Sequence, residues 1–184
     1  HIGRPVIRES LKTRDPAEAR RRAAERNLRW ERTFDYARQS RPVKSKPAVV
    51  RTELSAAEFE GVIAEYRRHL LASDETIRLR GLGGQKQGMP EAQFELYGEV
   101  LDDVERITAT SISRGRHLEP THLEEVDDHL ARLHITLDKN CVTYKRLAVE
   151  MLNTFAECVQ LWKQRQAGKI VRTPEKRPLE FGEE

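Results

Sequence analysis

Three consecutive arginines, Arg20 to Arg22, form the densest group of chemically active side chains in this sequence, and Arg26 and Arg29 continue the basic run. Guanidinium groups bind phosphate oxygens through charge-assisted hydrogen bonds, so a helix rich in arginine favours a nucleic-acid partner. The alternative is an ordinary solvated face, because glutamates in the same segment can neutralise part of the charge through (i, i+4) pairs: Glu18, Glu25 and Glu31.

The charge is unevenly distributed along the chain. Residues 1–51 hold 15 Lys and Arg against 6 Asp and Glu, a net charge of +9. Residues 52–168 hold 14 against 20, a net charge of −6, and residues 169–184 hold four of each sign. We therefore expect three parts: a basic segment with a linker, an acidic helical region, and a tail. A polyanion should dock on the first part.

Histidines recur at positions 117, 122, 129 and 134, but their spacing does not predict a metal site. The His-x-x-x-x-His interval is one residue longer than the helical histidine pair of Glu-assisted zinc enzymes. We expect ordinary surface histidines and no metal.

The glycine cluster from Gly81 to Gly88 does not predict a phosphate-binding loop. It lacks the Gly-Lys-Ser/Thr sequence of such loops and follows residues with a helical pattern. We expect a flexible connection there.

Cys141 and Cys158 are seventeen residues apart, without a Cys-x-x-Cys pair. We expect reduced thiols that serve packing.

No stretch approaches the roughly 18 apolar residues of a membrane span, so we expect a cytoplasmic protein with no membrane partner. Nothing in the sequence indicates a cofactor or a small-molecule substrate.

The basic residues lie on a helix with a well-defined start. Asp15 is suited to be its N-cap, Pro16 fits the first helical position, and Glu18 can close a capping box. Upstream, residues 5–13 are rich in β-branched side chains and alternate roughly in polarity, which predicts a short strand leading into this helix. Residues 40–52 contain two prolines and four basic residues and predict a linker.

Four substantial helices are expected between residues 54 and 168. The first starts at a capping box formed by Ser55 and Glu58; the others cover Pro90 to about Ser113, Thr121 to Leu133, and a last stretch through Tyr144 and Trp162 that stops at Gly168. A further short helix is expected from Ser73 to Leu82. The fold class is therefore mainly α, an antiparallel helical bundle with a short N-terminal strand leading into a basic helix.

The segment from Ile2 to Glu25, with the element Ser-Leu-Lys-Thr-Arg-Asp followed two residues later by Glu-Ala, resembles the N-terminal region of phage-type integrases of the tyrosine recombinase family. A looser likeness covers Leu137 to Asn140 and Tyr144 to Ala148, and extends to Gly168. The resemblance implies a DNA-integration protein whose N-terminal part binds double-stranded DNA. The matched basic positions are Arg8, Lys12, Arg14, Arg20, Arg21 and Arg22, which with Arg26 and Arg29 form the candidate DNA-binding set.

The catalytic residues of such a recombinase are not found here. That chemistry needs a tyrosine nucleophile with arginines and a histidine gathered around a phosphodiester. The single His-x-x-Arg sequence, His129 to Arg132, lies in an acidic amphipathic pattern that we interpret as a solvated face, and Tyr144 fits an apolar stripe. Because the chain begins at His1 without a methionine, we expect a fragment whose parent carries the catalytic domain beyond Glu184.

The leading hypothesis is therefore the non-catalytic, DNA-binding N-terminal part of a site-specific recombinase. The alternative is a helical protein-interaction or multimerisation module that contacts other integrase protomers or downstream domains. An autonomous enzyme is the third hypothesis and ranks last, because no nucleophile, paired carboxylates or metal cluster is evident in the sequence.

Overall fold

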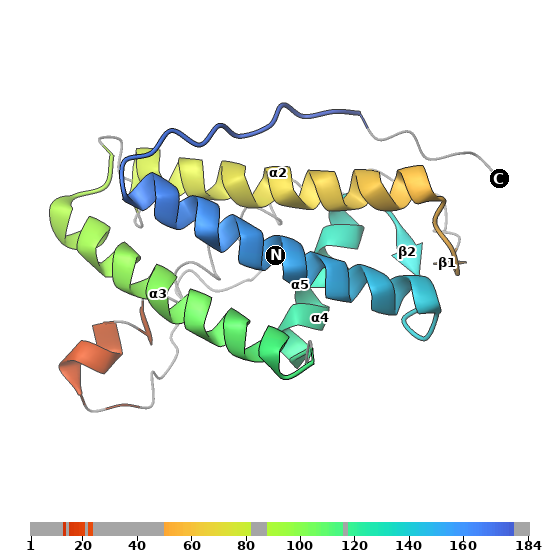
Figure 1. Cartoon of the computed structure of the whole chain (residues 1–184), viewed down its shortest axis with the longest axis horizontal. Helices are drawn as coiled ribbons and strands as arrows, with labels where there is room; N and C mark the ends of the chain where they lie inside the picture. Colours follow the sequence, from red (N-terminus) through yellow and green to blue (C-terminus); the bar gives the residue numbers. More distant parts are fainter. Residues whose placement is uncertain are drawn as a thin grey trace, which may run out of the picture.

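Apolar residues at helical spacing produce four helices in the computed structural model, which describes residues 13, 15–20, 22–23, 50–81, 88–115 and 118–178. The helices are α2 (Ala56–Arg80), α3 (Glu91–Ser113), α4 (Pro120–Arg132) and α5 (Val142–Gln166), as Figure 1 shows. Two short strands, β1 (Val50–Arg51) and β2 (Thr136–Leu137), form a parallel pair. Residues 16–20 and 22–23 are also helical. The predicted mainly α fold is confirmed.

Helix α5 is the centre of the bundle and contacts α2, α3 and α4. Its residues Leu147, Cys158 and Val159 are fully buried and pack in one core with Val62 and Leu70 of α2. Tyr97 and Leu101 of α3 and Val126 and Leu130 of α4 complete this core.

The directions of the helices follow from contacts between their side chains. Arg67 pairs with Glu157 and Asp74 pairs with Arg165, so α2 and α5 run in the same direction. The expected antiparallel arrangement is therefore wrong for this pair of helices. Gln166 of α5 bonds to Phe94 and Gln160 bonds to Glu105, in reversed order along the two helices, so α3 runs opposite to α5 and α2. Figure 1 shows this arrangement, with α2 above α5 and α3 below.

The start of α2 is fixed by the expected capping box. Ser55 Oγ accepts from the Glu58 N–H at 3.2 Å, and the Ser55 N–H donates to Glu58 Oε2 at 2.7 Å. Arg51 of β1 donates to both carboxylate oxygens of Glu58 at 3.0 Å. The hydrogen bonds from Arg51, followed by those from Ser55, lower the pKa of Glu58 to about 2. The last residues of the predicted linker are thereby attached to the bundle.

The short helix expected from Ser73 to Leu82 is wrong as a separate element, because α2 continues without a break to Arg80. Asp74 does not cap a new helix. It is 1% exposed, and its carboxylate accepts from Arg78 Nε at 3.0 and 3.1 Å, from Tyr97 OH at 2.8 Å and from Arg165 Nη1 at 2.8 Å. A buried carboxylate needs such partners, and here they come from three helices.

The two guanidinium groups around Asp74 extend the network to backbone groups. Arg78 donates to the Trp162 carbonyl at 3.0 Å and to Gln166 Oε1 at 2.9 Å, and Gln166 Nε2 donates to the Phe94 carbonyl at 2.8 Å. Arg165 Nη1 also donates to the Leu71 carbonyl at 2.8 Å. The C-terminal halves of α2 and α5 and the first turns of α3 are therefore held by one polar network.

The strands differ from the sequence-based expectation. The strand predicted for residues 5–13 lies outside the described residues, except for Thr13, which is in no regular element. The β1–β2 pair was not predicted, because each strand has only two residues and its partner is far away in the sequence.

No helix in the described part of the chain is long and apolar enough to cross a membrane.

We predict that Asp74→Asn lowers the free energy of unfolding by about 3–5 kcal/mol, because it leaves the buried guanidinium groups of Arg78 and Arg165 without a carboxylate. Denaturant unfolding of both proteins measures the change. The matched control is Asp102→Asn, whose carboxylate is 71% exposed and pairs with Lys163; its cost should stay below about 1 kcal/mol. Equal losses in the two variants would contradict the role of the Asp74 network.

Candidate functional site

The basic helix begins where the sequence predicts. Asp15 Oδ1 accepts from the Ala17 N–H at 3.0 Å, and the Asp15 carbonyl accepts from the Ala19 N–H at 2.8 Å. Thr13 joins the cap: its hydroxyl accepts from the Asp15 N–H at 3.2 Å and donates to Glu18 Oε2 at 2.6 Å. Glu18 is therefore linked to the N-cap through Thr13. This cap fixes the first turn from which the arginines project.

Two of the candidate DNA-binding residues are described. Arg20 is exposed, and its Nε donates to the Pro16 carbonyl at 3.3 Å. Arg22 is half-buried and pairs with Glu18 at 2.5 Å, which is one of the neutralising (i, i+4) pairs that the sequence allows. The other six lie outside the described residues: Arg8, Lys12, Arg14, Arg21, Arg26 and Arg29.

The interpretation of His129 as part of a solvated face is wrong. His129 is 1% exposed, and its Nε2 lies 2.9 Å from the Val62 carbonyl, with its ring 5.1 Å from that of Tyr66. Because a carbonyl only accepts, Nε2 carries the proton and donates it. Nδ1 has no hydrogen-bond partner within the described ranges. The ring is thus neutral, and burial, with a smaller effect of Arg132, lowers its pKa to about 3.

Tyr144 has a structural role that the sequence predicted in part, since it is buried on the apolar stripe of α5. Its hydroxyl donates to Asp127 Oδ1 at 2.9 Å, and Lys139 Nζ contacts Asp127 Oδ2 at 2.5 Å. Burial and the Asp127 carboxylate raise the pKa of Tyr144 above its usual range. Its phenol therefore remains protonated and is directed at a carboxylate, which is a poor setting for attack on a phosphodiester.

His122 and His134 are also separate from each other. His122 Nδ1 accepts from the Glu119 N–H at 3.1 Å at the start of α4, and His134 is exposed with a left-handed backbone (φ 58°) just after that helix. Among the described residues, no three His, Cys, Asp or Glu side chains come close enough together to hold a metal ion.

Both cysteines are free thiols. Cys158 lies in the core, where burial raises its pKa to about 11. Cys141 is half-buried at the N-cap of α5, and its Sγ accepts from the Tyr144 N–H at 3.2 Å. Their contacts are those of packing and capping residues.

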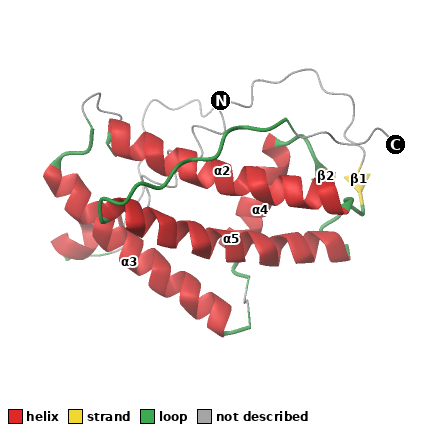
Figure 2. Cartoon of the chain, turned by 45° about the horizontal axis from the view of Figure 1, so that its top comes forward, coloured by secondary structure: helices red, strands yellow, loops and turns green. Residues whose placement is uncertain are grey.

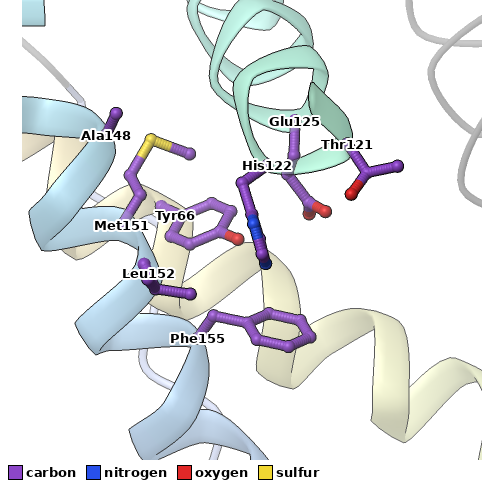
Figure 3. Close-up of a pocket in the computed structure, with 8 residues that line it drawn as sticks. All are labelled: Tyr66, Thr121, His122, Glu125, Ala148, Met151, Leu152 and Phe155. Atoms are coloured by element: carbon purple, nitrogen blue, oxygen red, sulfur yellow. The ribbon is translucent and has the colours of Figure 1, made fainter. Parts of the chain in front are cut away.

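A cavity of about 180 Å³ lies between α2, α4 and α5. Figure 3 shows its wall of Met151, Leu152 and Phe155 from α5, with His122 and Glu125 of α4 opposite. Ligand pockets are usually about 300–1,000 Å³, so this cavity is small for a cofactor or substrate. All of its lining residues belong to α2, α4 and α5 and none to the basic helix, and we assign the cavity no function.

Sequence reasoning missed a second group of basic side chains. The tail as a whole has four charges of each sign, but three of its four glutamates, Glu180, Glu183 and Glu184, lie at the very end. Residues 169–178 alone carry a net charge of +3, from Lys169, Arg172, Lys176 and Arg177 against Glu175. A narrower window of charge counting would have found this group.

Residues 1–39 match the model of a family described as "Domain of unknown function (DUF6538)". This match includes the basic helix start and all eight candidate DNA-binding residues. No curated protein and no solved structure matches the chain.

We predict that the free energy of unfolding decreases as the pH falls below the ordinary histidine pKa of 6.5. His129 resists protonation down to about pH 3 in the folded protein, so below pH 6.5 the unfolded chain binds the proton first. Between about pH 7.5 and about pH 5.5 this single group should cost about 1.4 kcal/mol.

Denaturant unfolding of the wild-type protein and His129→Gln at both pH values measures this cost. The glutamine does not titrate, so the variant should lose about 1.4 kcal/mol less stability over the interval than the wild type, whatever its stability at pH 7.5. Parallel pH dependences would show that His129 is not buried in its neutral form.

Proposed function

We propose that this chain is the non-catalytic, DNA-binding N-terminal part of a site-specific recombinase of the tyrosine recombinase family, acting in DNA integration and recombination. The resemblance of residues 2–25 to that family supports the proposal. Strand-exchange chemistry then belongs to another part of the parent protein. A cytoplasmic location and contacts with other integrase protomers or downstream domains are part of the same proposal.

The observation that carries the proposal is the separation of charge between the basic segment and the helical region. A net charge of +9 over residues 1–51 precedes a net charge of −6 over residues 52–168. A duplex carries about one negative charge per 1.7 Å of its axis, so it would be attracted to the first part and repelled by the second. Arg20, exposed on the capped first turn and in no ion pair with a described residue, is available for a phosphate.

The Arg22–Glu18 pair limits how much of this charge is free. A partly exposed (i, i+4) pair of this kind stabilises the helix only weakly, so Arg22 can exchange its carboxylate for a phosphate at small cost. We therefore include Arg22 among the contacts. Contacts of this type give affinity without base recognition.

We predict that this chain binds labelled duplex DNA with an affinity that falls steeply with salt. About five phosphate contacts give a slope of log K against log salt near −4 to −5. Changing Arg20, Arg21 and Arg22 to Gln (the N-terminal variant) should make the slope shallower by up to about 3, because three potential contacts are removed. Fluorescence anisotropy at several salt concentrations measures both quantities.

The matched control removes three positive charges from the helical region: Arg106→Gln, Arg114→Gln and Lys145→Gln (the bundle control). These residues are exposed and lie outside the basic segment, so affinity and slope should change little. Absence of binding by the wild-type chain at low salt, or equal losses in the two variants, would reject the proposed site.

The second candidate is a helical protein-interaction module, which one surface feature favours. Leu79 and Phe94 are 65% and 41% exposed at the same end of the bundle, where Gln166 bridges Arg78 and the Phe94 carbonyl. Sedimentation at several concentrations tests it: a dimer that Leu79→Ser with Phe94→Ser abolishes would support this module, and a monomer throughout would reject self-association.

A further inference from the structure

After α5 the chain does not leave the bundle. Residues 169–178, here called the strap, are extended and run back along α2, as Figure 1 and the turned view in Figure 2 both show. The Lys169 N–H donates to the Gln164 carbonyl at 2.9 Å, which closes the turn after the helix. The strap therefore has a defined path over the surface of α2.

A single side chain, Arg165, fixes the middle of the strap. Its Nε and Nη2 donate to the Val171 carbonyl at 3.1 and 2.9 Å, and Nη2 also donates to Thr173 Oγ1 at 2.9 Å. Arg165 is itself held by the buried Asp74 carboxylate, and its side chain is only 9% exposed. The position of the strap is thus coupled to the core network.

Thr173 completes the attachment to α2. Its hydroxyl donates to Glu75 Oε2 at 2.6 Å while accepting from Arg165. The strap is consequently bonded to α5 through Arg165 and to α2 through Glu75. These bonds hold the strap at Val171 and Thr173.

The cations on the strap are directed to solvent. Lys169, Arg172, Lys176 and Arg177 are exposed, and none of them forms an ion pair with a described residue. In contrast, the helical region neutralises many of its cations with carboxylates: Arg51, Arg67, Arg68, Arg106, Lys139 and Lys163. Positive charge without an ion-pair partner among the described residues is therefore concentrated on an extended segment that is attached to the bundle at Val171 and Thr173.

The spacing of these cations fits a long polyanion. Extended chain rises about 3.3 Å per residue, so Lys169 and Arg177 can be about 26 Å apart. The same length of duplex carries roughly 15 phosphates. Because Arg165 and Glu75 already hold the strap at Val171 and Thr173, binding costs less conformational entropy than it would for a free tail.

We propose that the strap is a second contact for nucleic acid, which binds the phosphate backbone of duplex DNA through Arg172, Lys176 and Arg177, with Lys169 at its edge. The choice of DNA as the ligand rests on the proposed function. We expect this contact to recognise the charge of the DNA backbone and not the base sequence, because lysine and arginine contacts to phosphate carry no sequence information. The acidic surface of α3 and α4 is excluded as this contact by its charge.

The test uses the full chain and anisotropy of labelled duplex DNA at several salt concentrations. The strap variant is Arg172→Gln, Lys176→Gln and Arg177→Gln, compared with the wild type, the N-terminal variant and the bundle control. Removal of two or three phosphate contacts should make the salt slope shallower by about 2 to 3 and weaken binding roughly tenfold or more at 0.1 M salt. The bundle control, with the same net charge, should bind nearly as the wild type does.

The outcomes separate this inference from the proposed function. If the N-terminal variant loses affinity and the strap variant matches the bundle control, the strap proposal is overturned and the proposed function stands. If only the strap variant loses affinity, the strap is supported and the N-terminal site is rejected. Absence of wild-type binding at low salt overturns both, and tight binding of an acidic polypeptide in that case would identify a protein partner.

Thr173→Val tests whether the fixed position of the strap matters. It keeps every charge but removes both hydrogen bonds of the hydroxyl. We expect affinity a few-fold weaker with an unchanged salt slope, because the same contacts form only after the strap is ordered. Unchanged affinity would show that the Thr173 hydroxyl does not position the strap for binding, since Arg165 still holds the Val171 carbonyl in this variant.

Discussion

The arrangement of this bundle depends on the neutralisation of one buried carboxylate. Asp74 is removed from water, and a charge in that position is tolerated only if it is paired and hydrogen-bonded. Arg78, Arg165 and Tyr97 supply four hydrogen bonds from three helices. Since one partner comes from α3 and another from α5, the carboxylate also specifies which ends of these helices meet. Apolar stripes alone would allow the helices to slide or reverse.

Much of the helical fold could be predicted from the sequence, because its signals are local. The Ser55–Glu58 capping box, Pro90, Thr121 and Gly168 are predicted helix ends that the structure reproduces within one or two residues. The error at Ser73 to Leu82 came from interpreting the polar stretch Ser73-Asp74-Glu75 as a helix cap, whereas Asp74 lies on the buried face of α2. It continues the four-residue spacing of Tyr66 and Leu70, so its position on the buried face was available as a signal.

The interior polar residues were harder to predict, because their partners are far away in sequence. His129 lies three residues after Val126 on the buried face of α4, but only the Val62 carbonyl on α2 explains why a histidine is accepted there. Arg165 lies three residues after Trp162 on α5, and its partners Asp74 and Thr173 are in different elements. The candidate DNA-binding residues came from the count of charges along the chain and from the resemblance of residues 2–25, and neither depends on distant contacts.

Because α2 and α5 are parallel, their helix dipoles are aligned. Each has 25 residues, and their peptide dipoles point the same way, with positive ends beside β1 and β2. Adjacent parallel dipoles repel, and the opposed dipole of α3 relieves only part of this. At the negative pole the last turns place Arg78, Arg80, Lys163 and Arg165, which stabilise the exposed carbonyl ends. The molecule therefore has two unlike poles, and the chain enters at the positive one through Val50.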